Sequence, residues 1–171
     1  MALPDYFKRE LGTAKVWKNS GGDGVITCTS LANAAAREGD KIDLGANWAR
    51  AWLVTFETKL VSAGTDRTEI ELYTNQSTSG TAGTANCGGA TGADAAFSNS
   101  STLKHQWTPV GSIAVANSAG TGVQRQCYEF TPSARYQSPL VVNNSGVAFS
   151  GTAGDTIITW TPLEESINDT A

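Results

Sequence analysis

The clearest pattern along the chain is an alternation of apolar and polar positions in residues 52–60 and 69–73. In the first run every second residue belongs to one mostly apolar set: Trp52, Val54, Phe56, Thr58 and Leu60. In the second run Ile70 and Leu72 alternate with Glu69, Glu71 and Tyr73. A period of two is that of a half-buried strand, and the polar residues 62–67 are long enough to reverse the chain. We therefore predict an antiparallel strand pair, with one face in a core and one in water.

Further strands are needed, because a lone strand pair is only marginally stable in water. Runs rich in β-branched and aromatic residues predict five of them: residues 25–29, 107–116, 123–130, 139–143 and 155–163. The turn-forming residues 117–122 make 107–116 and 123–130 a second candidate hairpin. Residues 30–38 predict one or two helical turns, or merely a coil. Seven or eight short strands with little helix predict a single-domain, all-β, antiparallel β-sandwich or barrel.

Two segments flank this predicted domain of residues 19–163. Residues 1–18 form a candidate extended N-terminal arm, since Leu3-Pro4 favours an extended backbone but the segment lacks a clear period. The arm is unusually apolar for a free tail, so it either packs on its own domain or reaches a neighbouring subunit. Its candidate partner-binding residues are Leu3, Tyr6, Phe7, Leu11 and Trp17. Residues 164–171 form an acidic C-terminal tail that we expect to fray.

A long excursion over residues 75–101 interrupts the predicted strands. It consists mainly of Gly, Ser, Thr, Ala and Asn. Long loops inside compact domains are usually functional or disordered. Phe97 is its candidate anchor and a further candidate partner-binding residue.

Bulk composition excludes several classes of function. The 171-residue chain has a formal net charge of −4 and a pI near 4.9, which argues against a nucleic-acid partner, because neutralising phosphates takes a basic surface. It has no apolar run of about 18 residues, so we expect no membrane partner, and no hydrophobic segment typical of a secretory signal. Cys28, Cys87 and Cys127 are odd in number and widely spaced, which predicts reduced thiols in a protein made in a cytoplasm.

Candidate catalytic chemistry is sparse. His105 is the single histidine, and the Glu69/Glu71 pair could mimic a glycosidase pair but more simply marks the solvent side of a strand. Asp94 stands alone. The sequence carries no nucleophile elbow, zinc-protease or P-loop motif, and its cysteines and histidine lack the short spacing of a zinc site. We therefore expect no catalytic residues, no metal and no cofactor.

The five tryptophans have two interpretations. Aromatic rings can serve as platforms for sugars, which would make the domain a carbohydrate-binding sandwich. Most tryptophans in small domains instead lie in the core or at subunit contacts. They are Trp17, Trp48, Trp52, Trp107 and Trp160.

Several segments together resemble small virion proteins of tailed bacteriophages. They are KVWKNSGGDGVITCTSLANAAAREGDKIDLG, TEIELYTNQS, CGGATGADAAF, VGSIAVA, FTPSARYQSPLVVNNSGVAF and ITWTPL. The resemblance covers residues 16–163 and rests on structural segments. It implies a capsid cement (decoration) protein with a jelly-roll-like sandwich, located on the capsid surface of the virion and made in the host cytoplasm.

This resemblance implies a non-enzymatic role. The implied partner is the major capsid protein, whose subunits such a protein bridges to stabilise the head. Self-association as a trimer or dimer would multiply weak contacts. A carbohydrate- or receptor-binding sandwich on the virion surface is the alternative, and a hydrolase using Glu69 or Asp94 is a third hypothesis.

Overall fold

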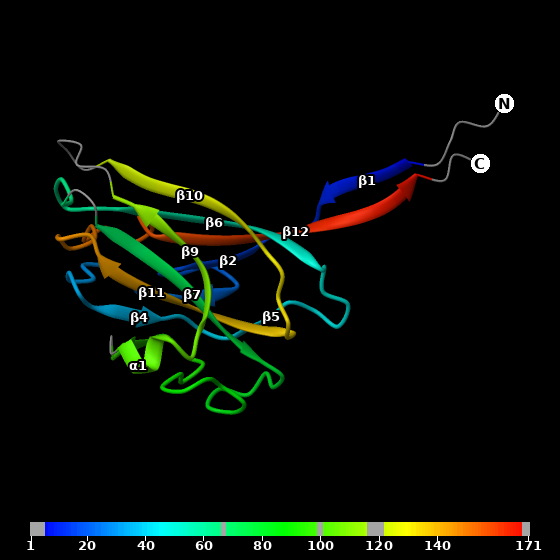
Figure 1. Cartoon of the computed structure of the whole chain (residues 1–171), viewed down its shortest axis with the longest axis horizontal. Coiled ribbons are helices and arrows are strands. Elements are labelled where there is room, and N and C mark those ends of the chain that lie inside the picture. Colours follow the sequence, from blue (N-terminus) through cyan, green and yellow to red (C-terminus); the bar gives the residue numbers. More distant parts are fainter. Residues whose placement is uncertain (1–5, 66–67, 99–100, 116–121, 169–171) are drawn as a thin grey trace.

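The computed structural model describes residues 6–65, 68–98, 101–115 and 122–168. Within them the chain forms two six-stranded sheets that pack face to face, and Figure 1 shows these two layers. The predicted all-β, single-domain sandwich is therefore confirmed.

The first sheet has the strand order β10-β6-β12-β2-β3, with β1 also paired to β12. All its pairs are antiparallel except β2 with β3. Its strands are β1 (Tyr6–Leu11), β2 (Lys15–Lys18), β3 (Gly24–Val25), β6 (Ala51–Lys59), β10 (Val123–Phe130) and β12 (Ile157–Asn168).

The second sheet has the order β8-β4-β11-β7-β9, with β5 also paired to β11. A single-turn helix, α1 (Ser101–Lys104), lies between β8 and β9 in the chain. The strands of this sheet are β4 (Ala36–Glu38), β5 (Ile42–Asp43), β7 (Glu69–Ser77), β8 (Ala95–Phe97), β9 (Thr108–Ala114) and β11 (Tyr136–Asn144).

Four antiparallel pairs are nested along the chain. β2 pairs with β12, β4 with β11, β6 with β10, and β7 with β9. Both predicted hairpins are therefore wrong. β6 and β7 lie in opposite sheets, and so do β9 and β10. Alternation fixes which face of a strand is buried, but it does not say which strand lies beside it.

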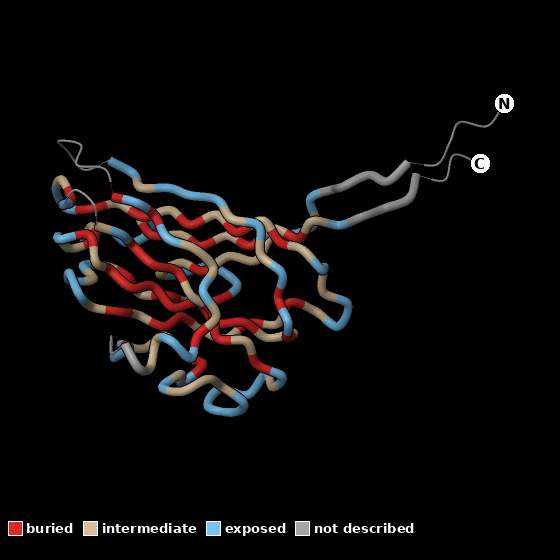
Figure 2. Tube along the Cα trace, viewed as in Figure 1, coloured by how far each residue is buried: buried red, intermediate tan, exposed pale blue. Residues whose placement is uncertain are grey.

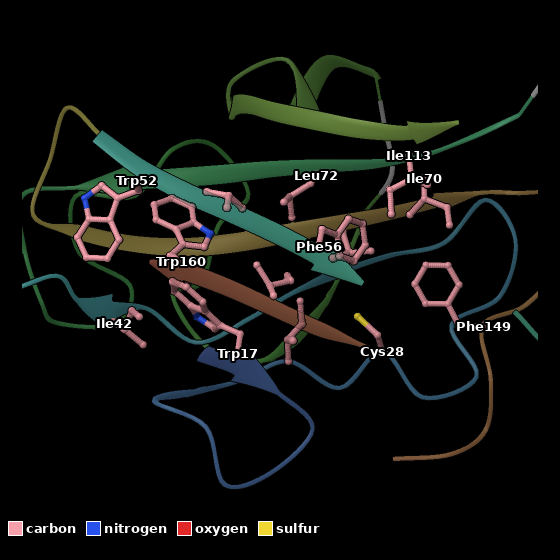
Figure 3. Close-up of a cluster of buried hydrophobic side chains, with 14 of the residues drawn as sticks. Trp17, Cys28, Ile42, Trp52, Phe56, Ile70, Leu72, Ile113, Phe149 and Trp160 are labelled. Carbon is pink, nitrogen blue, oxygen red and sulfur yellow. The ribbon is translucent and has the colours of Figure 1, made fainter. Parts of the chain in front are cut away.

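The predicted inward set of the first run is confirmed, since all five residues from Trp52 to Leu60 are buried. They join a core between the sheets that includes Trp17 and Trp160, and Figure 2 shows that buried positions concentrate there. The Trp160 ring lies 5.6 Å from Trp17, 6.3 Å from Trp52 and 5.2 Å from Phe130, measured between centroids. Figure 3 shows the three tryptophans gathered at one end of this core. These three are core residues rather than sugar platforms.

A second apolar cluster forms where the predicted excursion meets the second sheet. Leu140 and Val142 of β11 belong to it, whereas Val141 belongs to the main core. β11 is therefore buried on both faces, which explains its continuous apolar run. Phe97 packs against Trp107 with their rings 5.2 Å apart, so its predicted role as the anchor of the excursion is confirmed.

Buried polar side chains fasten the glycine-rich loop, residues 78–94, to this sheet. Glu38 is 1% exposed and accepts hydrogen bonds from the Thr91 and Gly92 amides and the Thr91 hydroxyl, at 2.7–2.9 Å. The Lys41 ammonium donates to four oxygens at 2.9–3.1 Å, those of the Ser77 hydroxyl and of three loop carbonyls: Ser79, Thr81 and Thr84. The loop thus surrounds one carboxylate, that of Glu38, and one ammonium group, that of Lys41.

Two predictions at other segments need correction. Of the two alternatives for residues 30–38, the helix is absent, because Ser30 and Ala34 take φ values of 55° and 63°, which a right-handed helix cannot contain. Residues 30–35 form turns and coil, the other alternative. β4 occupies the end of that segment. The predicted frayed tail begins instead as the last part of β12, which is paired with β1 as far as Asn168.

Candidate functional site: a projecting ribbon and the hollow at its base

A two-stranded ribbon projects from one end of the sandwich (Figure 1). It consists of β1 and the last six residues of β12, paired in antiparallel register from Leu11↔Leu163 to Tyr6↔Asn168. The first and last described residues are therefore partners at its far end. β2 follows β1 in the chain but lies within the first sheet, so the predicted arm of residues 1–18 divides into a ribbon strand and a sheet strand.

Each strand of the ribbon leaves one backbone edge open among the described residues. Leu163 pairs with Ala51 on one side and Leu11 on the other. Because β6 begins at Ala51, β12 continues beyond Leu163 with β1 as its single described partner. β1 in turn pairs with β12 alone. Open edges of this kind are templates for another strand.

The base of the ribbon is a tightly packed joint. The Gly12 amide donates to the Pro162 carbonyl at 3.0 Å. A Cβ at Gly12 would lie 2.7 Å from Cγ of Pro162 and 2.3 Å from Oε1 of Glu164. Glycine is thus required for this close approach. Leu11, beside the joint, is 67% exposed and is the most exposed large apolar residue described.

A hollow of about 700 Å³ opens where β6 begins and β12 continues past it. The segment before β6 forms one wall, held by a hydrogen bond of 2.9 Å from the Trp52 indole to the Ala49 carbonyl. Trp48 is partly exposed there and Arg50 is exposed. The lining residues are Asn47, Trp48, Ala49, Arg50, Ala51, Glu129, Thr131, Leu163 and Glu164.

The structure distributes the predicted partner-binding residues unevenly. Tyr6 and Phe7 lie in β1 and Leu11 ends it, so three of them share the ribbon. Trp17 and Phe97 are buried in the two apolar clusters and present little surface to a partner. Leu3 lies outside the described residues.

Sequence reasoning missed the β12 half of the ribbon and the hollow. The paired glutamates at 164 and 165 suggested a solvated tail. Leu163 and Ile167 are four residues apart, which places them on one face of a strand, and they were the available signal. The hollow had no signal, because its lining comes from three segments that only the fold brings together.

Of the candidate catalytic carboxylates, Glu71 and Asp94 are engaged within the protein and Glu69 is exposed. Glu71 is buried, which corrects the expectation that it faces solvent beside Glu69. It contacts the Lys104 ammonium at 2.7 Å and accepts a hydrogen bond of 2.8 Å from Tyr73. Burial and this hydrogen bond raise the pKa of Tyr73 well above its ordinary value. His105 is exposed.

Asp94, the last residue of the glycine-rich loop, joins that loop to Thr27 and Arg37. Its carboxylate accepts hydrogen bonds from the Thr27 amide at 2.9 Å, the Thr27 hydroxyl at 2.6 Å and Arg37 Nε at 2.6 Å. Burial raises the pKa of Asp94, but the hydrogen bonds from Arg37 and Thr27 outweigh it and leave the pKa below its usual range. Asp94 therefore acts as a fixed anion joining three segments.

The described residues form neither a metal site nor a membrane-spanning helix. In the described part of the chain, no three His, Cys, Asp or Glu side chains gather as a metal site would require. No described helix is long and apolar enough to cross a bilayer. Comparison with protein-family models and with curated protein sequences finds no match to this chain.

Proposed function

We propose that this chain is a non-enzymatic structural protein of a bacteriophage virion, a cement protein that decorates the head. The observation that carries the proposal is the ribbon, which extends away from the sandwich with two open edges. An element built in this way adds backbone and side-chain contacts to a neighbour. Its partner under this proposal is the major capsid protein, across whose subunits it would lie on the capsid surface.

The strand topology supports this proposal. We infer that the sandwich is a jelly roll, on the basis of its nested pairs β2–β12, β4–β11, β6–β10 and β7–β9. Jelly rolls occur in viral capsid and lectin domains. One fold can host many functions. The choice of a capsid role over other functions therefore rests on the ribbon and on the resemblance of residues 16–163 to phage virion proteins.

The polar interior also supports a structural role. Glu38, Lys41 and Asp94 fasten the glycine-rich loop, and Glu71 pairs with Lys104. These groups stabilise one arrangement of loops on the second sheet. A rigid body with a protruding ribbon suits a protein that works by attachment. A stable complex of ordinary size buries about 1,600 Å² in total, to which the ribbon and the hollow beside it would both contribute.

The test is a binding experiment with undecorated heads. Purified protein and a variant lacking residues 1–12 are mixed with heads, which are then sedimented and imaged by electron microscopy. We expect the full chain to bind and the truncated chain, still folded by its tryptophan fluorescence, to bind at least tenfold more weakly. A full chain that does not bind would overturn the proposal.

A matched pair of point variants sharpens this test. Leu11→Asp places a charge on the exposed apolar residue at the ribbon base, and Val61→Asp does the same at the 49% exposed Val61 elsewhere on the sandwich. We expect Leu11→Asp to weaken head binding and Val61→Asp to leave it unchanged. Equal effects would mean that the ribbon is not the contact.

One observation favours carbohydrate or receptor binding as a second candidate function. Trp48 is partly exposed in the hollow beside Arg50 and Glu129, and an aromatic ring flanked by polar groups suits a sugar. A glycan array with the wild type and Trp48→Ala tests this candidate. Binding lost in the variant would support it, and an array without signal would remove it.

A further inference from the structure

We propose that copies of this chain associate through the edges of the ribbon. The open edge of β12 in one copy pairs with the open edge of β1 in the next, so that the ribbons form a closed ring. This inference does not depend on the capsid role, because it concerns contacts between copies of this chain alone. In such a ring the ribbon edges contact other copies, so a capsid subunit would contact the outer face of the ring.

The first argument comes from backbone hydrogen bonds. A two-stranded ribbon alone is marginally stable in water, and this one has five residue pairs beyond Leu163, the last residue of β12 that β6 supports. Protected edges usually carry proline, a bulge, a covering segment or charged side chains. Residues 6–11 and 163–168 contain no proline or glycine, and the register between them is continuous. Charged side chains are therefore the protection that these two strands carry, and they repel an edge of like charge but not one of opposite charge.

The second argument is the charge of the two edges. β1 contains Lys8 and Arg9 with one glutamate, whereas the ribbon part of β12 contains Glu164 and Glu165 and no cation. Two β12 edges brought together would oppose four carboxylates, and like charges across a strand pair are destabilising. Unlike edges attract. The charges therefore select a second copy of the chain, placed head to tail rather than about a two-fold axis.

The third argument is the apolar pattern given by the register. Positions 7 and 11 of β1 pair with positions 167 and 163 of β12 and lie on one face of the ribbon. All four carry large apolar residues: Phe7, Leu11, Leu163 and Ile167. The pair between them on the same face, Arg9 with Glu165, is oppositely charged. Closing the ribbons into a barrel would bury this face and leave no open edge. Two ribbons supply four strands, half of the eight whose interior is just wide enough for side chains, so the ring needs more than two copies.

The hollow provides room for this addition. It lies at the corner where β6 begins at Ala51 and the β12 edge becomes open, and Leu163 and Glu164 line it. A strand added along the open edge of β12 would begin beside this hollow.

The experiment measures the mass of the full chain by light scattering after size exclusion, at 0.15 M salt. Wild type is expected to form one species of three copies or more. Lys8→Glu/Arg9→Glu makes both edges acidic, and Glu164→Lys/Glu165→Lys makes both edges basic, so each variant alone is expected to be monomeric. Glu57→Lys/Glu69→Lys changes the net charge by the same amount and sign as Glu164→Lys/Glu165→Lys but lies away from the ribbon, so it is expected to assemble as wild type.

Mixing the two edge variants separates contacts between copies from contacts within one ribbon. In each variant positions 9 and 165, which pair within one ribbon, carry like charges, and mixing does not change this. In the mixture, however, an acidic edge of one variant can meet a basic edge of the other. We expect the equimolar mixture to regain an oligomer that contains both chains. Hydrogen exchange provides a second measurement, since the amides of 163–168 should be protected in the wild-type assembly and lose protection on dilution.

Three results would overturn the inference: a monomeric wild type at tens of micromolar, a wild-type oligomer that both edge variants retain, or an equimolar mixture that stays monomeric. Head binding is measured separately. A ring that fails to bind heads would leave this inference standing and remove the capsid role, and a monomer that binds heads would do the reverse.

Discussion

Replacing Asp94 with asparagine tests the view that a few buried ions hold the glycine-rich loop on the second sheet. The change keeps the shape of the side chain and removes its charge. The new amide group would face Thr27 or Arg37, which already donate to this position. Arg37 would then lack its carboxylate partner while remaining largely buried.

The expected loss follows from the burial of the ion pair. The side chains of Arg37 and Asp94 are 23% and 16% exposed, with 2.6 Å between Nε and Oδ1. Exposed pairs contribute about 0–1 kcal/mol, and breaking a fully buried pair costs about 3–5 kcal/mol. We therefore expect Asp94→Asn to lower the free energy of unfolding by about 2–3 kcal/mol. With a urea slope of roughly 1–3 kcal/mol per molar, the midpoint should fall by about 1 M.

The pH dependence supplies an independent signature. The pKa of Asp94 lies below its ordinary value in the folded protein, so its stabilising effect is complete above the unfolded pKa of about 3.9. It is lost as the pH falls through the folded pKa. The stability gap between wild type and Asp94→Asn should therefore stay constant from pH 7 to about pH 5 and close at lower pH.

Glu57→Gln is the matched control, because Glu57 and Arg125 form an exposed pair 3.5 Å apart with side chains 34% and 61% exposed. It should cost less than about 1 kcal/mol. Equal midpoints for the two variants would refute the reasoning about burial. A gap for Asp94→Asn that persists below the folded pKa would refute the assignment of its effect to the charge.

Three further predictions concern other parts of the sandwich. Lys41→Met should remove the ammonium that binds three carbonyls of the glycine-rich loop and the Ser77 hydroxyl. The expected cost is about 1–2 kcal/mol of local stability, so subtilisin should cut the loop about 5- to 30-fold faster than in wild type. Trp160→Ala should lower the free energy of unfolding in urea by about 3–5 kcal/mol through the cavity it leaves, whereas Trp160→Phe should cost much less, because the buried indole nitrogen has no hydrogen-bond partner in the described structure; equal costs would contradict this. Among the thiols, Cys127 is exposed and Cys28 is buried, and burial raises the pKa of Cys28 and brings that of Cys87 to about 12, so native protein treated with a maleimide at pH 7 should gain one label by intact mass, at Cys127.

The sequence predicts the fold class well, because period-two patterning reports burial directly. β6 is an example, with each residue predicted to face inward found in the core. The partners of the strands could not be predicted in the same way. Residues 60–68 connect opposite sheets, and a polar connection of this length serves equally well for a hairpin or a crossing between sheets.

The candidate site was only partly visible in the sequence for a different reason. An arm carrying Tyr6, Phe7 and Leu11 was predicted from its apolar residues, yet its partner strand lies more than 150 residues later in register with it. The loop contacts of Glu38 and Asp94 likewise join residues more than 50 positions apart. Contacts at such separations leave no periodic trace in the sequence.

The nested pairing has a consequence for how the chain is made. β12 lies between β6 and β2, so the first sheet stays in two pieces until β12 has been synthesised. Strand pairs so distant in the chain form slowly, because a long loop must close before the contacts stabilise it. The inner tryptophans Trp17 and Trp52 therefore lack the packing of Trp160 until β12 joins the sheet. The strand that completes the first sheet also forms half of the ribbon, so both are completed by the same strand.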